Sequence, residues 1–258
     1  MLQTVPLTVM RLDVYLAESG LASSRSEAKA LIEEGAVSVA SRTVTKPAFD
    51  VTGQESTVSV DKSEHRYVGR GGMKLEAAIA DFGIVCEGRR CLDVGASSGG
   101  FTDCLLKNGA DHVIALDSGH GQLVSSLRED GRVTVIEDYN ARYLKLSDLE
   151  YAASLAVMDV SFISATYIIP ALSECLCRGA DFICLIKPQF EVGRAGVGKG
   201  GIVKDEKVRL SAVSRVVECA ESVGFTLLGR ITSPIRGGDG NVEYLAHFRL
   251  TSDEDSVV

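Results

Sequence analysis

The strongest constraint on the fold is the stretch from Cys91 to Phe101, which reads Cys-Leu-Asp-Val-Gly-Ala-Ser-Ser-Gly-Gly-Phe. An apolar strand runs into a group of small residues, and an amphipathic helix follows. Glycine lacks Cβ, so a ligand can approach its backbone closely, and the N–H groups of the helix start point at the same place. The pattern predicts a small-molecule cradle at the carboxyl end of a strand, where open α/β sheets bind their ligands.

Predicted strands and helices alternate from Gly88 onward, which indicates an α/β fold. We expect strands at Cys91–Val94, His112–Asp117, Arg132–Ile136, Leu155–Asp159, Phe182–Lys187, Thr226–Ile231 and Val242–Arg249. We expect helices near Phe101–Asn108, Gln122–Asp130, Ile163–Cys177 and Glu206–Val223. Only the loop Pro234–Asn241 separates the last two strands, so they should pair antiparallel. The prediction is a Rossmann-like sheet of seven strands, mostly parallel with the last antiparallel, as in class I methyltransferases.

A small α+β unit is predicted before this region, over residues 9–60. Its pattern gives helices at Arg11–Leu16 and Ser24–Ile32, and short strands at Ala36–Val39 and Thr57–Val60. The order Arg-Leu-Asp, Ser-Arg-Ser-x-Ala and Ile-x-x-Gly-x-Val resembles the S4 RNA-binding domain. That resemblance implies RNA contacts from Arg11, Arg25 and Lys29. Because acidic residues outnumber basic ones in this unit, a small module for protein contacts remains an alternative.

Composition limits the function classes. The net charge of −8 argues against a uniformly basic nucleic-acid binder, so RNA contact requires a local positive patch. The seven cysteines contain no Cys-x-x-Cys pair, which favours reduced thiols in the cytoplasm and no metal site. We predict neither a signal peptide nor a membrane span, and the oligomeric state stays open. Residues 61–68 are predicted as a linker, 69–250 as the large domain and 251–258 as an acidic tail.

The glycine cluster favours a cofactor without a pyrophosphate. Ser97 stands where the dinucleotide motif Gly-x-Gly-x-x-Gly has its second glycine. Carboxylates accompany the ends of four predicted strands, and although any one could be a helix cap, together they favour a cationic ligand that carries adenosine. S-adenosylmethionine fits this description. The expected contacts are Asp93, Gly95, Ala96, Ser97, Gly99, Gly100, Phe101, Asp117, Asp138 and Asp159.

Five further segments give a specific family resemblance. They are Gly-Gly-Met-Lys-Leu (71–75), Asp-Val-Gly-Ala-Ser-Ser-Gly-Gly-Phe-Thr-Asp (93–103), Met-Asp-Val-Ser-Phe-Ile (158–163), Lys-Pro-Gln-Phe-Glu (187–191) and Ser-Pro-Ile-Arg-Gly with Gly-Asn-Val-Glu (233–243). Together they resemble the TlyA family of ribosomal RNA ribose 2′-O-methyltransferases, historically labelled haemolysins. The resemblance runs from about Met10 to Arg249 and implies an S4 domain joined to an FtsJ-like methyltransferase domain, with cytidine in ribosomal RNA as substrate.

The resemblance also implies a catalytic tetrad of Lys74, Asp159, Lys187 and Glu243. Methylation of a 2′-hydroxyl requires that the oxygen be positioned and its proton removed. A lysine can be the base when burial and a neighbouring cation favour its neutral form, and Lys187 suits that role with Lys74 nearby. Asp159 and Glu243 would orient the two lysines by charge-assisted hydrogen bonds. No metal is needed for this reaction.

Basic residues in loops near the predicted site would form a positive rim that contacts RNA phosphates. They are Arg66, Arg70, Arg194, Lys199, Lys204 and Arg236, and Glu191 and Asp239 interrupt them. Three alternatives remain: a methyltransferase that acts on another RNA or on a protein, a non-catalytic ribosome-associated factor that has kept the fold, and a pore-forming haemolysin.

Overall fold

The computed structural model describes residues 9–22, 24–33, 35–61, 66–193 and 196–251. Arg194, half of the predicted linker and all of the predicted acidic tail except Thr251 lie outside these residues.

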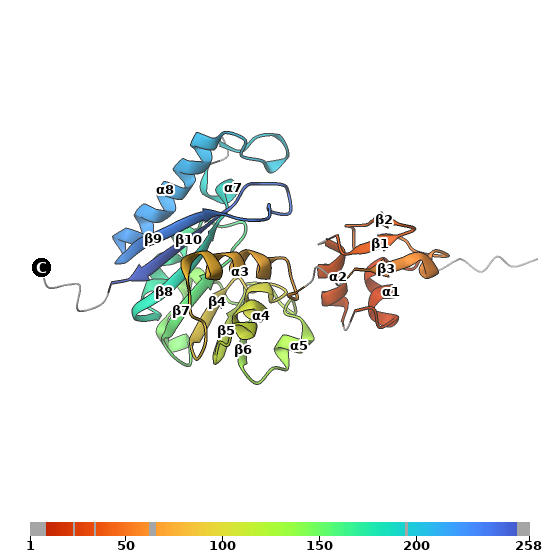
Figure 1. Cartoon of the computed structure of the whole chain (residues 1–258), viewed down its shortest axis with the longest axis horizontal. Coiled ribbons are helices and arrows are strands. Elements are labelled where there is room, and N and C mark those ends of the chain that lie inside the picture. Colours follow the sequence, from red (N-terminus) through yellow and green to blue (C-terminus); the bar gives the residue numbers. More distant parts are fainter. Residues whose placement is uncertain (1–8, 23, 34, 62–65, 194–195, 252–258) are drawn as a thin grey trace, which may run out of the picture.

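The large domain is built on a seven-stranded sheet in the order β6-β5-β4-β7-β8-β10-β9 (Figure 1). The strands are β4 (Arg90–Val94), β5 (His112–Leu116), β6 (Val133–Ile136), β7 (Ala153–Met158), β8 (Leu176–Ile186), β9 (Phe225–Thr232) and β10 (Tyr244–Leu250). Neighbours from β6 to β8 pair parallel, whereas β10 pairs antiparallel with both β8 and β9. The predicted mostly parallel sheet with an antiparallel last strand is confirmed.

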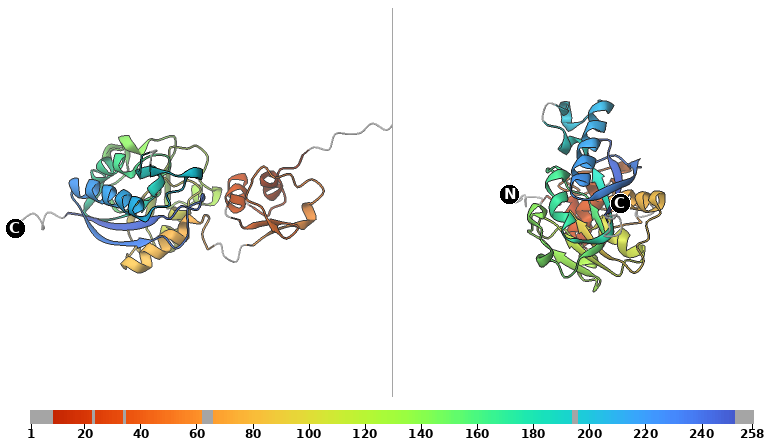
Figure 2. Two further views of the ribbon diagram at one scale, coloured as in Figure 1. Left: turned by 90° about the horizontal axis from the view of Figure 1, so that it is seen from above. Right: turned by 90° about the vertical axis from the view of Figure 1, so that its left-hand side faces the viewer.

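Helices cover both faces of this sheet (Figures 1 and 2). They are α3 (Gly71–Phe82), α4 (Gly100–Lys107), α5 (Ser125–Arg128), α6 (Ile169–Ser173), α7 (Pro188–Glu191) and α8 (Glu206–Ser222), with 3₁₀ turns η2 (Ala141–Tyr143), η3 (Leu146–Asp148), η4 (Ala165–Tyr167) and η6 (Lys199–Gly201). One core packs α3 and α4 against the sheet through residues such as Leu75 and Leu105. The other packs α6 and α8 through residues such as Leu172 and Val216.

Two predicted helices are much shorter in the structure, and the strand predicted at 182–187 is much longer. Only Ser125–Arg128 is α-helical within the predicted helix 122–130, because Val124 is still extended. The predicted helix 163–177 is interrupted, and it was wrong at its end, where residues 176 and 177 belong to a strand. Its chain forms η4 and α6, and strand β8 already begins at Leu176, which pairs with Ala153 of β7. Pairing with a neighbouring strand thus overrides the apolar pattern that suggested a helix.

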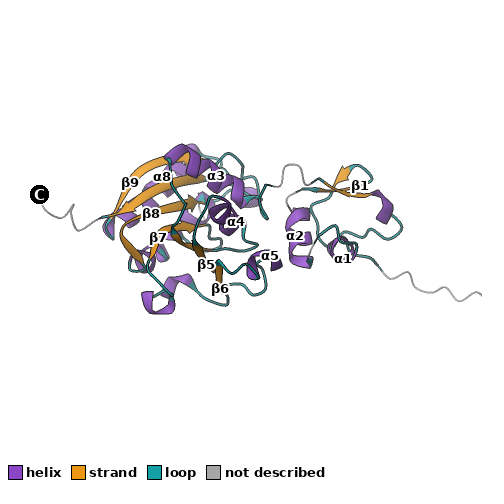
Figure 3. Ribbon diagram, turned by 60° about the horizontal axis from the view of Figure 1, so that its bottom comes forward, coloured by secondary structure: helices purple, strands orange, loops and turns teal. Residues whose placement is uncertain are grey.

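The N-terminal unit has a core of its own. Its elements are α1 (Leu12–Glu18), α2 (Arg25–Glu33), β1 (Val37–Val39), β2 (Arg42–Thr43), the 3₁₀ turn η1 (Glu55–Thr57) and β3 (Val58–Val60). Leu12, Leu16 and Ile32 of the helices pack on Val37 and Val39 of the sheet. Figure 3 shows α2 on the side that faces α4 and α5 of the large domain.

Tyr67 and Val68, predicted as linker, pack in the large domain's core instead. A Cβ on Gly72 would lie 2.3 Å from the ring of Tyr67, so the missing side chain at Gly72 makes room for it. The ordered start of the large domain therefore includes residues before the predicted boundary at 69.

Candidate active site

The carboxyl edge of the parallel strands gathers the residues singled out in the sequence. Gly95 follows β4, Asp117 follows β5, Asp159 follows β7 and Lys187 follows β8. Because β10 runs in the opposite direction, Glu243, which precedes it, lies at the same edge. Two adjoining cavities of about 600 and 460 Å³ open there, and both are lined by Gly95, Ser97, Gln122, Asp159 and Ser161.

The cradle predicted from the glycine cluster requires glycine at two positions. Gly95 has φ +87° and Gly99 has φ +102°, in the left-handed region that glycine tolerates. A Cβ on Gly95 would lie 2.4 Å from the backbone oxygen of Asp159, and one on Gly99 would lie 2.3 Å from Leu127. Because these side chains are missing, the loop can pass close to Asp159 after β7 and to Leu127 of α5.

Asp117 fixes the shape of this cradle. Its Oδ2 accepts a hydrogen bond from the Ser97 amide at 2.8 Å, and its Oδ1 accepts one from the Gly119 amide at 2.7 Å. A carboxylate has about four acceptor sites, so Asp117 keeps capacity for ligand hydroxyls.

The smaller cavity has the features of a nucleoside site. Apolar side chains line it together with Asp117 and Asn140; they are Tyr139, Ala141, Phe162, Ile163 and Ile168. An apolar slot with a few polar groups is typical of small-molecule sites. Asp117 can accept from ribose hydroxyls, while Asp159, which lines both cavities, can attract a positive group. The residues present therefore fit S-adenosylmethionine.

Asp93 lies beneath the cradle rather than in it. Its side chain is fully buried in β4 and outside the lining of both cavities. Thr102 Oγ1 of α4 donates to Asp93 Oδ2 at 2.6 Å, and Oδ1 has no hydrogen-bond partner among the described residues. Burial raises the pKa of Asp93 to about 7, although the hydrogen bond from Thr102 lowers it. The structure thus gives Asp93 a contact with α4, not with the cavity.

The structure does not bring Asp138 to the cavities either. Its backbone has φ +56°, and its exposed side chain pairs with His120 Nδ1 at 2.8 Å. Tyr139 and Asn140, the next residues along the chain, line the smaller cavity instead. The carboxylate after β6 therefore points elsewhere, because a single left-handed residue redirects it.

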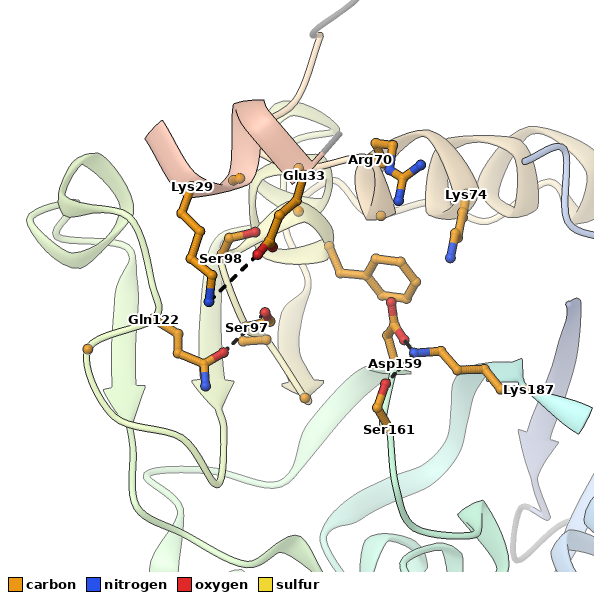
Figure 4. Close-up of a pocket in the computed structure, with 18 of the residues that line it drawn as sticks. Lys29, Glu33, Arg70, Lys74, Ser97, Ser98, Gln122, Asp159, Ser161 and Lys187 are labelled. Carbon is orange, nitrogen blue, oxygen red and sulfur yellow. Dashed lines mark hydrogen bonds and ion pairs between the residues drawn. The ribbon is translucent and has the colours of Figure 1, made fainter. Parts of the chain in front are cut away.

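The four predicted catalytic residues form two lysine–carboxylate pairs, and Figure 4 shows the pair of Lys187 with Asp159. Lys187 Nζ lies 2.5 Å from Asp159 Oδ1 and donates a hydrogen bond to Ser161 Oγ at 2.8 Å. Lys74 Nζ donates to Glu243 Oε2 at 2.6 Å. Lys74 and Glu243 are 8% and 2% exposed, so the second pair is buried. Lys74, Asp159 and Lys187 line the larger cavity together.

The buried pair explains a lysine in the first turn of α3, where a cation opposes the helix dipole. Removing one partner of such a pair would leave an uncompensated buried charge, a costly state. The loop before β10 carries Glu243 and is itself held in place. Asn241, buried, accepts from the Val203 amide at 3.0 Å and donates to the Gly201 carbonyl at 2.9 Å.

The predicted RNA-contacting residues are divided between several environments. Lys29 and Arg70 line the larger cavity, with Lys29 contributed by α2 of the N-terminal unit. The other predicted RNA-contacting residues that the structure describes lie outside the lining of both cavities. Their contacts are Arg11 and Arg25 with Asp13, Arg66 with Glu76, and Arg236 with the Gly240 carbonyl; Lys199 lies in η6.

The sequence reasoning missed several residues at the site. Gln122 and Ser161 line both cavities, and Glu33 of α2 lines the larger one. Phe162 is 92% exposed, has φ +65° and packs on Phe190 with a ring-centroid distance of 5.2 Å. Phe162 lies three residues after Asp159 in the segment Met-Asp-Val-Ser-Phe-Ile (158–163). Its closeness to Asp159 in the sequence could have marked it as a residue of the site.

The described residues contain neither a membrane-spanning helix nor a cluster of metal ligands. No helix within these ranges is long and apolar enough to cross a bilayer. No group of three or more His, Cys, Asp or Glu side chains in the same ranges is arranged to hold a metal ion.

Comparison with known proteins identifies both parts of the chain. Residues 67–250 match the family described as FtsJ-like methyltransferase, and residues 10–56 match the S4 domain. The N-terminal unit is therefore an S4 domain, as its sequence predicted.

Similar proteins cover nearly the whole chain. The 16S/23S rRNA (cytidine-2′-O)-methyltransferase TlyA of Mycobacterium tuberculosis is 45% identical over 94% of this chain and 91% of that protein. Hemolysin A of Brachyspira hyodysenteriae is 46% identical over 93% of this chain and 99% of that protein. A solved hemolysin structure from Streptococcus thermophilus has a TM-score of 0.75 at 40% identity and covers 96% of this chain and 92% of that one. The chain thus belongs to the TlyA family of S4-domain-containing ribosomal RNA ribose 2′-O-methyltransferases, which are S-adenosylmethionine-dependent enzymes.

Proposed function

We propose that this protein transfers a methyl group from S-adenosylmethionine to the 2′-hydroxyl of a cytidine in ribosomal RNA. The observation that carries this proposal is the meeting of two lysine–carboxylate pairs, Lys187 with Asp159 and Lys74 with Glu243, beside a nucleoside-sized cradle. The choice of cytidine follows from the activity printed for the Mycobacterium tuberculosis relative. Action on ribosomal RNA would place the protein and its partner ribosomal subunits in the cytoplasm.

The cofactor would be held by the cradle and the smaller cavity. Asp117 would accept from the ribose hydroxyls, Gly95 and Gly99 would give close access to backbone, and Ile163 and Ile168 would pack against the base. When bound, S-adenosylmethionine supplies a methyl group on a positively charged sulfur, which an oxygen nucleophile can displace. Asp93 would act indirectly, by holding the first turn of α4 through Thr102.

Lys187 would remove the proton of the 2′-hydroxyl. Its Nζ lies in the larger cavity, where Asp159 and Ser161 fix its position. In the proton-accepting step Lys187 must be the neutral amine, because only the neutral form has a lone pair. A positioned base of this kind typically contributes about 10² to 10⁴ in rate. Lys74 and Glu243 would orient the hydroxyl from the buried side.

RNA would reach this site along its charged and aromatic rim. The S4 domain contributes Lys29 to the wall of the larger cavity, and Arg70 lies in the same wall. The exposed ring of Phe162 offers a stacking surface for a base that leaves its neighbours, as single-stranded RNA recognition commonly requires. We propose that residues 9–60 bind RNA and that residues 69–250 transfer the methyl group.

Mapping of 2′-O-methyl positions tests the proposal. Ribosomal subunits that lack the modification would be incubated with labelled S-adenosylmethionine and the protein, with or without prior RNase treatment. We expect label in RNA at a cytidine ribose, none after RNase treatment, and none with Lys187→Ala. Label in protein, or at an RNA base, would show that the substrate assignment is wrong. Cofactor binding without any methyl transfer would instead favour the non-catalytic factor.

Lysis of red cells by the purified protein tests the haemolysin alternative. We expect no lysis by the wild type or by the Lys187→Ala variant. Lysis that is equal in both proteins, without RNA methylation, would favour that alternative over the enzyme.

A further inference from the structure

Glu191 is a buried carboxylate that the proposed chemistry does not use. It ends α7, the four-residue helix directly after Lys187, and it is only 4% exposed. It lies outside the lining of both cavities. The sequence suggested that it interrupts the positive rim, but its burial removes it from that surface. A buried carboxylate is costly unless specific partners compensate it, so its contacts require an explanation.

Both oxygens of Glu191 bind the chain that follows β7. Its Oε1 accepts from the Ala165 amide at 2.8 Å, and its Oε2 accepts from Ser164 Oγ at 2.5 Å. Ser164 is in turn the N-cap of η4, because its Oγ accepts from the Thr166 amide at 3.2 Å. Burial raises the pKa of Glu191, whereas the hydrogen bonds from Ser164 and Ala165 lower it. The carboxylate therefore holds the start of η4 on the end of α7.

The two segments that Glu191 joins are those that carry the outer lysine–carboxylate pair. One contains Asp159 and Ser161, and the other begins at Lys187. They touch at the cavity through Lys187 Nζ, which lies 2.5 Å from Asp159 and 2.8 Å from Ser161 Oγ. They touch again where the Phe162 and Phe190 rings pack. Glu191 is the third connection, and it lies outside the lining of both cavities.

We propose that Glu191 is a positioning residue that sets the geometry of Lys187 against Asp159 and Ser161. This inference rests on the proposed function and adds a residue to it. With the carboxylate in place, Glu191 and Lys187 both connect the two segments. The Lys187 amine then has a defined direction. Without it, the loop that carries Ser161 and Phe162 loses its anchor. A displacement of about 1 Å at a reacting group can reduce the rate about 100-fold.

The test compares Glu191→Gln with Glu191→Asp and with a control at the other end of the sheet. Asp181→Asn is the matched control, because Asp181 is also a buried carboxylate and contacts no residue of the cavities. We expect Glu191→Gln to lower kcat for ribosomal RNA methylation about 100-fold, with KM for RNA and the calorimetric Kd for S-adenosylmethionine changed less than threefold. Glu191→Asp, which retains both acceptor oxygens, should recover part of kcat.

The outcomes separate this inference from the function on which it rests. A wild-type protein that does not methylate ribosomal RNA contradicts the proposed function, whatever Glu191 does. An active wild type together with a Glu191→Gln variant of equal kcat contradicts the positioning role. A Glu191→Gln variant that loses thermal stability but keeps kcat, as we expect of Asp181→Asn, contradicts it as well, because Glu191 would then stabilise the fold alone.

Discussion

The two ends of the central sheet hold their buried charges in opposite ways. At the end away from the site, Asp181 accepts hydrogen bonds from Arg89, His247 and Arg249, and these contacts hold its pKa well below the usual range even though burial opposes them. At the carboxyl edge, Asp93 accepts from Thr102, its Oδ1 has no hydrogen-bond partner among the described residues, and burial raises its pKa. One end satisfies its carboxylate completely, while the other keeps a buried acid that is incompletely satisfied.

This difference indicates that the end of the sheet around Asp181 contributes to stability, whereas the carboxyl edge contributes to ligand binding and chemistry. A saturated charge cluster has no capacity left for a ligand, so it can serve only the fold. The carboxyl edge instead has left-handed backbone at Gly95, Ser97 and Phe162. Both lysines and Asp159 line the larger cavity there. Such features cost stability and are typical of functional sites. The comparison predicts that substitutions of the lysine–carboxylate pairs at the carboxyl edge lower kcat. Substitution of Asp181 at the opposite end should lower the free energy of unfolding instead.

The largest expected effect is that of Lys187→Ala on the reaction. Loss of the proposed base should lower kcat by about 10² to 10⁴, because no other described amine lies within the Asp159–Ser161 contacts. Single-turnover methylation of ribosomal RNA measures this rate, and calorimetry should show S-adenosylmethionine affinity within a few-fold of wild type. Methylation at a near wild-type rate would remove Lys187 from the mechanism.

The next effect concerns stability and pH at Asp93. Its folded pKa of about 7 lies above the ordinary value of 3.8, so its contribution to stability is full below about pH 4 and is lost as the pH rises through 7. Relative to Asp93→Asn, the wild type should lose up to about 4 kcal/mol in free energy of unfolding between pH 4 and pH 8. Urea denaturation of both proteins across this range measures the difference. Parallel pH profiles would show that Asp93 does not titrate there.

Asp181→Asn should act at the other end of the sheet with the opposite pH dependence. The lowered pKa of Asp181 means that its contribution is present above about pH 4 and is lost as the pH falls below that value. Leaving Arg89, His247 and Arg249 without their carboxylate should cost about 3 kcal/mol at pH 7. Denaturation at pH 7 and pH 3 should show the gap to wild type narrowing in acid. A fall in kcat for the folded variant would contradict the division between the two ends.

The smallest effect is expected on the rim. Lys29→Ala should weaken RNA binding. It should also reduce the slope of log K against log salt concentration by about 1, the value for the loss of one phosphate contact. Lys46→Ala is a matched control, because Lys46 is an exposed lysine of the same domain outside the cavity lining. Filter binding at several salt concentrations measures both slopes. Equal slopes for the two variants would place the RNA contact elsewhere.

Residues at the ends of apolar strands were predictable from the sequence. A short buried strand followed by Gly95 or Lys187 fixes the position of the next side chain, since parallel strands end at one edge. Glu243 could be placed by the same reasoning once the last two strands were predicted as antiparallel. For these positions, local pattern and sheet topology carry the information.

Side-chain directions and long-range docking were not predictable in this way. Asp138 turns away because one residue adopts a left-handed backbone, and no pattern marks that residue. Glu33 and Lys29 reach the larger cavity only because α2 lies beside the large domain. Glu191 is charged and was predicted on the surface, yet the chain after β7 covers it. Each case depends on contacts between segments far apart in the sequence.

The Lys74–Glu243 pair has a consequence for how the enzyme is made. The two residues are 169 positions apart, and Glu243 is held in place by β10, the last strand of the sheet. During synthesis the glycine cradle leaves the ribosome long before this strand does. A partly synthesised chain therefore contains the residues of the cradle, but the proposed Lys74–Glu243 pair forms only after the final strand has emerged and inserted between β8 and β9. On the proposed mechanism methylation has to wait for that insertion, so an unfinished copy would not modify the ribosome that is translating it.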